Sequence, residues 1–164
     1  MINEIGIHHL KTCHMLFMII DKIHKSLPRE YLKAPCSQDE MNKAEEELRF
    51  SLPPVLKEIY NHYNGIVGPY RTYFLFPLGV NEIDKEYSLV SWNLFWQPDG
   101  NAIPDWISEF VAYGFSSAQE TWAMRRTEPY DIIVYYLPDS DEFKQFKGDL
   151  VDLIIADQEG FTGL

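Results

Sequence analysis

The chain has 164 residues, of which 46% are hydrophobic and 15% aromatic, and it carries a formal net charge of -11. This length suits one domain that buries its own core, and the composition is too apolar for a disordered protein. A surface this acidic repels nucleic-acid backbones and anionic membranes and attracts basic proteins, although acidity can also serve solubility alone. We therefore expect neither a nucleic-acid partner nor a membrane partner.

The sequence also indicates the cellular compartment of the protein. The longest apolar run that could be a targeting or membrane segment, Met15–Ile20, is far too short to span a bilayer, and Asp21 and Lys22 interrupt it. Cys13 and Cys36 form no disulfide framework or zinc motif and are expected to be free thiols. These features favour a cytoplasmic protein without a signal peptide.

The N-terminal residues are expected to be helical. Apolar residues recur at helical spacing between Leu10 and Leu27, and Pro28 then closes the pattern. The sequence predicts that residues 1–35 form a helical extension packed on a single domain of residues 36–164.

The stretch Ser37–Gly65 predicts two consecutive helices. Ser37 and Glu40 have the spacing of a capping box, and an apolar face follows at Met41, Ala44 and Leu48. Prolines 53 and 54 suit the first turn of the second helix. The apolar stripe of this helix comprises Val55, Leu56, Ile59, Tyr60 and Tyr63. Asn64-Gly65 is expected to end the helix, with Gly65 at positive φ.

Shorter elements are predicted after this pair of helices. A loop over Gly65–Arg71 precedes a strand at Tyr73–Phe76, and Asn81 or Glu82 can start another helix. The expected apolar face of that helix comprises Ile83, Tyr87, Val90 and Leu94. The segment Gln97–Asn101 has the composition of a turn.

The second half of the chain predicts mainly strands. Candidates are Phe110–Phe115, Glu120–Arg126 and Ile132–Leu137, and the last is apolar enough to lie centrally in a sheet. Asp149–Asp157 predicts a final helix with Leu150, Leu153 and Ile154 facing inward. The order of elements favours an α+β fold in which helices pack against a mostly antiparallel sheet of about four to six strands.

Catalytic and metal-binding patterns are incomplete. The five histidines form no HExxH motif, and none occurs after His62, which removes the base that a serine nucleophile in Gly114–Ala118 would need. That segment is expected to be a hairpin turn. Asp139–Glu142 begins like a calcium loop, but Lys144 and Leu150 stand where the loop needs Gly and Glu. We expect no enzyme activity, no metal and no cofactor.

The helical pair resembles the SUKH superfamily of Smi/Knr-like domains. Members typically carry A-E-x-x-L, then L-P-x-x-L/Y-K-x-x-Y/L, then N-G. The matching positions here are Ala44, Glu45, Leu48, Leu52, Pro53, Leu56, Lys57, Tyr60, Asn64 and Gly65. The resemblance extends over about Ser37–Tyr136. It departs at Tyr113–Ser117, where the family often has a turn rich in Gly and Asp. The resemblance implies the same α+β fold and structural roles for Glu45, Leu52, Pro53, Asn64 and Gly65.

The resemblance also implies a function. Many members are bacterial immunity proteins that bind and neutralise a cognate toxin, often a nuclease, and an acidic protein could occlude the basic substrate cleft of such a toxin. The alternative from the same family is an intracellular regulatory or scaffold module. The sequence leaves the oligomeric state open.

Aromatic and charged residues near predicted loops are the candidate contacts for a protein partner. Aromatic anchors with a polar rim are typical of binding hot spots, although most aromatic residues of a domain belong to its core. The candidates are Tyr70, Arg71, Trp92, Trp96, Asp99 and Glu120.

Overall fold

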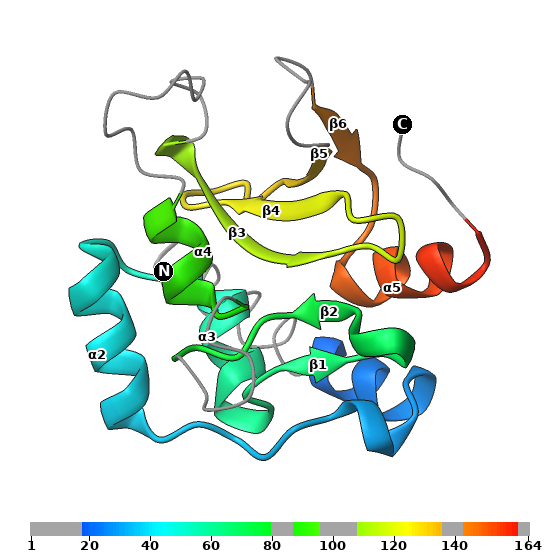
Figure 1. Ribbon diagram of the computed structural model, residues 1–164, viewed down its shortest axis with the longest axis horizontal. Helices are drawn as coiled ribbons and strands as arrows, with labels where there is room; N and C mark the ends of the chain where they lie inside the picture. Colours follow the sequence, from blue (N-terminus) through cyan, green and yellow to red (C-terminus); the bar gives the residue numbers. More distant parts are fainter. Residues whose placement is uncertain (1–17, 80–86, 96–107, 136–142, 161–164) are drawn as a thin grey trace, which may run out of the picture.

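The computed structural model describes residues 18–79, 87–95, 108–135 and 143–160. Within these ranges the chain forms helices and two antiparallel sheets, one of two strands and one of four. The α3 helix (Pro54–His62), the two-stranded sheet and residues 18–26 lie on one side of the four-stranded sheet (Figure 1). The predicted α+β class and antiparallel pairing are confirmed, with the strands divided between two sheets.

Residues 18–26 form a helix and Arg29–Tyr31 a short 3-10 turn, η1. The inward face of the helix carries Ile19, Ile20 and Ile23, which are buried together with Leu27 in the main core. The predicted apolar face is thus present in the described part of the segment. Its earlier positions, including Cys13, lie outside the described residues.

The α2 helix, Gln38–Leu48, has the predicted start. The Glu40 N–H donates to Ser37 Oγ at 3.2 Å, and the Ser37 N–H donates back to the Glu40 carboxylate at 2.7 Å. Met41, Ala44 and Leu48 are buried as expected. The capping box and the apolar spacing therefore fix both the start and the inward face of this helix.

The α3 helix, Pro54–His62, ends earlier than predicted. Tyr63 is already extended, and its N–H makes the last helical bond, to Ile59. The next residue joins other segments, because the Asn64 N–H donates to Ala34 O and its side chain accepts from the Leu78 N–H, both at 2.8 Å. Asn64-Gly65 is therefore a junction between segments and not the helix cap that the sequence predicted.

Gly65 has the predicted positive φ, at 116°, three residues after the end of α3. A Cβ atom there would lie 3.3 Å from Leu75 O. We expect Gly65→Val to lower the free energy of unfolding by about 1 kcal/mol or more, because backbone strain and crowding act together. Urea unfolding checks this result, with Gly79→Val as the control, since Gly79 is exposed. Equal losses in the two variants would contradict the role given to Gly65.

A short hairpin follows α3. It pairs β1, Ile66–Val67, with β2, Tyr73–Leu75, and its loop contains the 3-10 turn η2, Pro69–Arg71. The sequence predicted β2 but assigned residues 66–67 to a loop, because two residues are too few to show strand alternation.

The α4 helix, Leu89–Phe95, also begins later than predicted. Ser88 caps it, with its Oγ accepting the Ser91 N–H at 3.0 Å, and the Leu89 N–H donates to Pro77 O at 2.8 Å. Tyr87 precedes the helix, and Leu94, expected to face inward, is 43% exposed. Residues 81–86 and the turn expected at residues 97–101 lie outside the described residues.

The larger sheet has the strand order β3-β4-β5-β6. Its strands are Phe110–Phe115, Thr121–Arg125, Ile132–Tyr135 and Lys144–Phe146. The first three were predicted, and β5 lies inside the sheet as its apolar run indicated. The largely exposed β6 was not predicted, since it has no apolar pattern. Residues 116–120 form the expected hairpin turn between β3 and β4.

The two sheets meet where β2 crosses β3. The Phe76 N–H donates to Tyr113 O at 2.7 Å, directly after β2 ends. Nearby, Phe74 stacks on Trp122 with the ring centroids 5.6 Å apart, and both residues are buried. The position of the hairpin is therefore set by the core of the four-stranded sheet.

The last helix, α5, spans Leu150–Gln158, with Asp149 as its cap. Leu150, Leu153 and Ile154 are buried, as predicted. Near its other end, Asp157 is 6% exposed and accepts the N–H and hydroxyl of Ser117 at 3.1 and 3.0 Å. The final helix is thus tied to the turn between β3 and β4.

Asp157 is expected to make the stability of the protein depend on pH. Burial chiefly raises the pKa of this carboxyl, the bonds from Ser117 oppose the rise, and the charge of Glu120 adds to it. Because the pKa is raised on folding, the ionised form opposes folding at neutral pH, and this penalty vanishes below the ordinary Asp pKa of about 3.9. The stability of Asp157→Asn relative to the parent protein should therefore rise between pH 4 and pH 7.

Paired denaturation curves at several pH values test this dependence. Asp157→Ala is the control and should lose about 1 kcal/mol, because it also removes the acceptor for Ser117. A stability difference between Asp157→Asn and the parent that falls with rising pH would contradict the argument.

Candidate partner-binding surface

The loop between β1 and β2 presents an aromatic side chain to solvent. Tyr70 is fully exposed, with a relative accessibility of 102%. Its backbone is left-handed, with φ 54° and ψ 27°, and Arg71 follows at φ 61°. This conformation costs roughly 1–2 kcal/mol for each residue that is not glycine. Strain of this kind concentrates at binding sites, so it directs attention to the loop.

The base of the loop holds this conformation. The Gly68 N–H donates to Thr72 O at 2.8 Å, and the Thr72 N–H donates to Pro69 O at 3.0 Å. A Cβ atom at Gly68 would lie 2.3 Å from the ring of Phe74, so the loop base packs directly on the core. The loop is therefore closed by hydrogen bonds and anchored beneath, while its tip is exposed.

A group of aromatic side chains continues from the loop. The ring of Tyr73 stacks on Tyr87 with centroids 5.5 Å apart, and Tyr87 stacks on Trp92 at 6.1 Å. Phe115 makes edge contacts with Tyr73 and Tyr87. Tyr87, Trp92 and Phe115 are half-buried. We call Tyr73, Phe76, Tyr87, Trp92 and Phe115 the aromatic cluster.

The structure thus places three of the candidate contacts on connected elements. Tyr70 and Arg71 lie in the loop and Trp92 lies in the aromatic cluster, two residues of which come from β2 or directly follow it. Trp96 and Asp99 lie outside the described residues. We therefore treat the exposed loop together with the half-buried rings of the cluster, Tyr87, Trp92 and Phe115, as the candidate partner-binding surface.

Glu120 lies elsewhere and is only 4% exposed. Its N–H donates to Ser116 Oγ at 3.0 Å, and its carbonyl accepts the Ser116 N–H at 2.8 Å. The sequence placed it at the start of a predicted strand, beside a loop, and the tight turn at residues 116–120 folds it inward. Its burial argues against Glu120 as a contact for a partner.

The motif residues hold the two helices in place. Glu45 Oε1 accepts the Leu52 N–H at 2.6 Å and pairs with Lys57 Nζ at 2.7 Å, so one carboxylate joins α2 to the start of α3. Leu52 is 2% exposed and Pro53 is also buried. These contacts give Glu45, Leu52 and Pro53 a place in the packing of α2 against α3.

Other site types find no support in the described part of the chain. There, no group of three or more His, Cys, Asp and Glu side chains is arranged to hold a metal ion. Among the same residues, no helix has both the length and the apolar character needed to cross a bilayer.

A comparison with known proteins identifies the family of this domain. The sequence matches the SMI1/KNR4 family (SUKH-1) over residues 35–156, about three quarters of the chain. The protein belongs to the SMI1/KNR4 family (SUKH-1). The match contains both motif helices, the exposed loop, the aromatic cluster and most of α5. No curated protein matches the chain.

Membership in the SUKH-1 family is consistent with either an immunity protein or a Smi/Knr module, and in both cases with a protein partner. The match starts after residues 18–27, although Ile19, Ile20, Ile23 and Leu27 belong to the same core as the matched region.

The exposure of Tyr70 could not be predicted, because the Gly68-Pro69 pair indicates a turn but not which side chain the turn exposes. Only the three-dimensional arrangement shows that Tyr70 is at the tip.

Proposed function

We propose that this SUKH-1 protein is an immunity protein that neutralises a cognate toxin by binding it and not by catalysis. The observation that carries the proposal is Tyr70, a fully exposed aromatic residue on a closed and anchored loop. The proposed place of action is the cytoplasm, where an intracellular toxin would meet its inhibitor.

The geometry suits tight binding to a protein. A tyrosine supplies a large contact area with few rotatable bonds, and a loop already held in one conformation loses little entropy on binding. The half-buried rings of the aromatic cluster extend the apolar area beside β2. Aromatic anchors of this type dominate many protein interfaces.

The negative net charge of the protein favours a partner with a basic surface. With a net charge of -11, the protein attracts a cationic surface at long range, and nucleases need such a surface to bind nucleic acid. Electrostatic attraction would raise the association rate, while Tyr70 and its neighbours would slow dissociation. Trp96 and Asp99 remain predicted contacts.

Tyr70→Ala tests the proposed surface. The binding partner to use is a toxin domain, to be sought first in the gene next to the one that encodes this chain. We expect the variant to raise the Kd on the order of 30-fold, mainly through faster dissociation, because hot-spot aromatics contribute about 2 kcal/mol. Surface plasmon resonance separates the association and dissociation rates.

Phe143→Ala is the matched control. Phe143 is also an exposed aromatic residue, at 39%, but it precedes β6 and contacts Phe110 outside the aromatic cluster. The Kd of the Phe143→Ala variant for the toxin should stay close to that of the parent protein. Equal Kd values for Tyr70→Ala and the parent protein would show that Tyr70 does not contact the toxin. Absence of any binding would favour the alternative function, a regulatory or scaffold module.

A further inference from the structure

A pocket of about 550 Å³ lies between residues 18–26, the segment that leads to α2 and the end of α3. Its polar lining residues are His24, Arg29, Lys33, His62 and Tyr63. We call it the basic pocket, because four of its described lining residues are basic and none of them is acidic. None of these residues belongs to the candidate partner-binding surface.

The lining of the basic pocket has the opposite charge to the chain as a whole. The protein has 25 Asp and Glu residues against 14 Lys and Arg residues. Arg29 and Lys33 are exposed, and in the described part of the chain neither forms an ion pair with a carboxylate. Glu58 contacts His62 at 3.3 Å but does not line the pocket. The pocket therefore holds two positive charges that have no carboxylate partner among the described residues.

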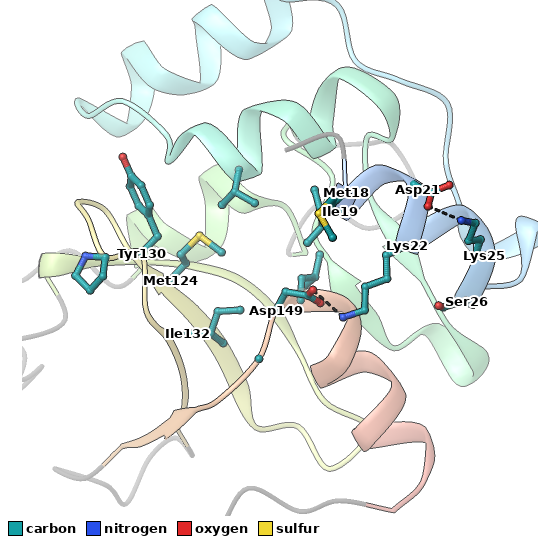
Figure 2. A pocket seen from close by; sticks show the side chains of 14 residues that line it. Met18, Ile19, Asp21, Lys22, Lys25, Ser26, Met124, Tyr130, Ile132 and Asp149 are labelled. Atoms are coloured by element: carbon teal, nitrogen blue, oxygen red, sulfur yellow. Dashed lines mark hydrogen bonds and ion pairs between the residues drawn. The ribbon is translucent and has the colours of Figure 1, made fainter. Parts of the chain in front are cut away.

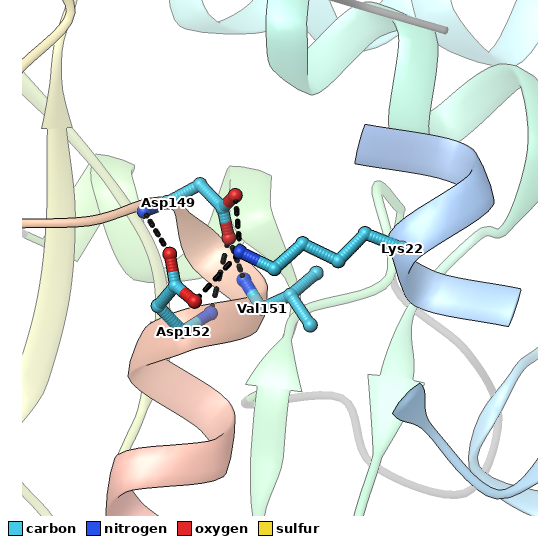
Figure 3. A network of polar contacts seen from close by, with 4 residues as sticks. All are labelled: Lys22, Asp149, Val151 and Asp152. Carbon is cyan, nitrogen blue, oxygen red and sulfur yellow. Dashed lines mark hydrogen bonds and ion pairs between the residues drawn. The ribbon is translucent and has the colours of Figure 1, made fainter. Parts of the chain in front are cut away.

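A larger pocket beside the same N-terminal helix differs in this respect. It has a volume of about 660 Å³ and is lined mainly by apolar side chains (Figure 2). Its lysines are already paired, since Lys22 Nζ donates to the carboxylates of Asp149 and Asp152 at 2.7 and 2.6 Å (Figure 3). Lys25 pairs with Asp21 at 2.6 Å. The cations of that pocket are neutralised within the protein, whereas Arg29 and Lys33 are available to a ligand.

Hydrogen bonds between segments hold the basic pocket in shape. The Lys33 N–H donates to Gly65 O at 3.2 Å, which joins the segment before α2 to the residues after α3. The Tyr63 hydroxyl contacts His24 Nε2 at 2.5 Å, which joins the end of α3 to the N-terminal helix. The pocket is therefore formed before a ligand binds, and this lowers the entropic cost of binding.

The side chains of the basic pocket have the chemistry that a phosphate group requires. A guanidinium presents a planar fork of N–H donors that fits phosphate oxygens, and an ammonium supplies a compact positive charge. A phosphate monoester carries a charge of about -1.5 to -2 at neutral pH and three acceptor oxygens. Arg29 and Lys33 match this charge, and His24, His62 and Tyr63 add hydrogen-bonding groups. A carboxylate, with one negative charge, would leave one of the two cations without a partner.

The basic pocket also has room and apolar surface for more than a phosphate group. Leu27, Leu32, Ala34 and Pro35 line it together with the polar residues. Sites for small organic ligands commonly have volumes of about 300–1,000 Å³ and combine an apolar lining with a few polar groups. This mixture of a doubly charged end and an apolar wall indicates the class of ligand.

We propose that the basic pocket binds a small, soluble organic phosphate monoester. Its phosphate contacts Arg29 and Lys33, and its apolar body lies against Leu27, Leu32 and Pro35. This inference goes beyond the proposed function and does not depend on it, because the pocket is not part of the candidate partner-binding surface.

An NMR titration of the full chain with phenyl phosphate tests the proposal. This probe joins one phosphate group to an apolar ring, and it should shift the amide signals of residues 32–34 and 62–63. Arg29→Ala and Lys33→Ala should each raise the Kd on the order of tenfold, because hydrogen bonds between charged groups are the strong ones. Both side chains are exposed, so we expect these variants to fold as the parent protein does.

Lys144→Ala and Lys147→Ala are the matched controls. Each removes one positive charge from an exposed position in or beside β6, so the net charge changes as it does in the pocket variants. Their Kd values should stay within about twofold of the parent value, because solvent and salt screen distant charges. Unchanged Kd values for Arg29→Ala and Lys33→Ala would overturn the proposal, as would equal rises in the controls or the absence of binding.

Three further probes test the class of ligand. Inorganic phosphate lacks the apolar body and benzoate lacks the second charge, so both should bind more weakly than phenyl phosphate. Equal affinity for either probe would overturn the assignment to an organic phosphate monoester. Vesicles of phosphatidylcholine with phosphatidic acid should not carry the protein down on sedimentation, since the protein is strongly acidic. Co-sedimentation that Arg29→Ala abolishes would assign the pocket to a lipid headgroup and overturn a soluble ligand.

Discussion

Gly114→Ala should destabilise the protein by about 3 kcal/mol or more. The Cβ atom of an alanine would lie 2.3 Å from Phe74 O, 2.7 Å from Phe74 C and 2.8 Å from Tyr73 O. These atoms belong to the backbone of β2, which cannot move aside as a flexible side chain can. Overpacking of this kind costs 1–3 kcal/mol or more, and the rigid contact places Gly114 at the upper end.

The effect should extend to the candidate partner-binding surface. Gly114 lies where β3 passes β2, and β2 follows directly from the loop that carries Tyr70. Molecules of the variant that still fold must separate the two strands and so displace the hairpin. We expect them to bind the partner less tightly than the parent protein does.

Urea unfolding monitored by tryptophan fluorescence measures the loss of stability. Gly79→Ala is the control, because Gly79 is exposed and a Cβ atom there would meet no atom of the described chain within 4 Å. Its free energy of unfolding should change by less than about 0.5 kcal/mol. A Gly114→Ala midpoint equal to that of the parent would show that the two strands do not approach this closely.

Asn93→Ala should cost about 3 kcal/mol. Asn93 is 6% exposed, and its amide pairs with the backbone of β3 as a neighbouring strand would. Its Nδ2 donates to Ala112 O at 2.7 Å and its Oδ1 accepts the Ala112 N–H at 2.9 Å, while Nδ2 also donates to Leu89 O. Alanine would leave two buried groups of Ala112 without these bonds, at about 1–3 kcal/mol each.

The measurement is again the free energy of unfolding in urea. Asn42→Ala is the control, since Asn42 is exposed on α2 and its side chain contacts Gln38 on the same helix. Asn93→Asp is a second test variant. At neutral pH an ionised carboxylate beside Ala112 O should destabilise the protein at least as much as alanine does. Stability of Asn93→Ala within about 0.5 kcal/mol of the parent would contradict the bridging role.

The helices with clear end signals could be predicted from the sequence, because those signals are local. Ser37 and Glu40 fix the start of α2 by bonding each other's backbone, and Asp149 does the same for α5 with Asp152. The apolar run of Ile132, Ile133 and Val134 indicated an inner strand. In each of these cases the residues that determine the element lie close together in the sequence.

The features that position the candidate surface are set by contacts between distant segments. Asn93 meets Ala112 and Gly114 meets Phe74, and no spacing within the sequence indicates either contact. For the same reason the local sequence predicts a helix cap at Asn64-Gly65, since the Leu78 N–H that binds Asn64 comes from a segment beyond β2. The exposure of Tyr70 and the burial of Glu120 also depend on this packing.

The central claim is that this SUKH-1 protein neutralises a toxin by binding it. The most direct test is growth of cells that express the candidate toxin domain, sought in the gene next to this one, together with this chain. We predict that the parent protein restores growth and elutes with the toxin as a complex on gel filtration, and that Tyr70→Ala protects less than Phe143→Ala does. No rescue and no complex, with both proteins folded and expressed, would contradict the claim.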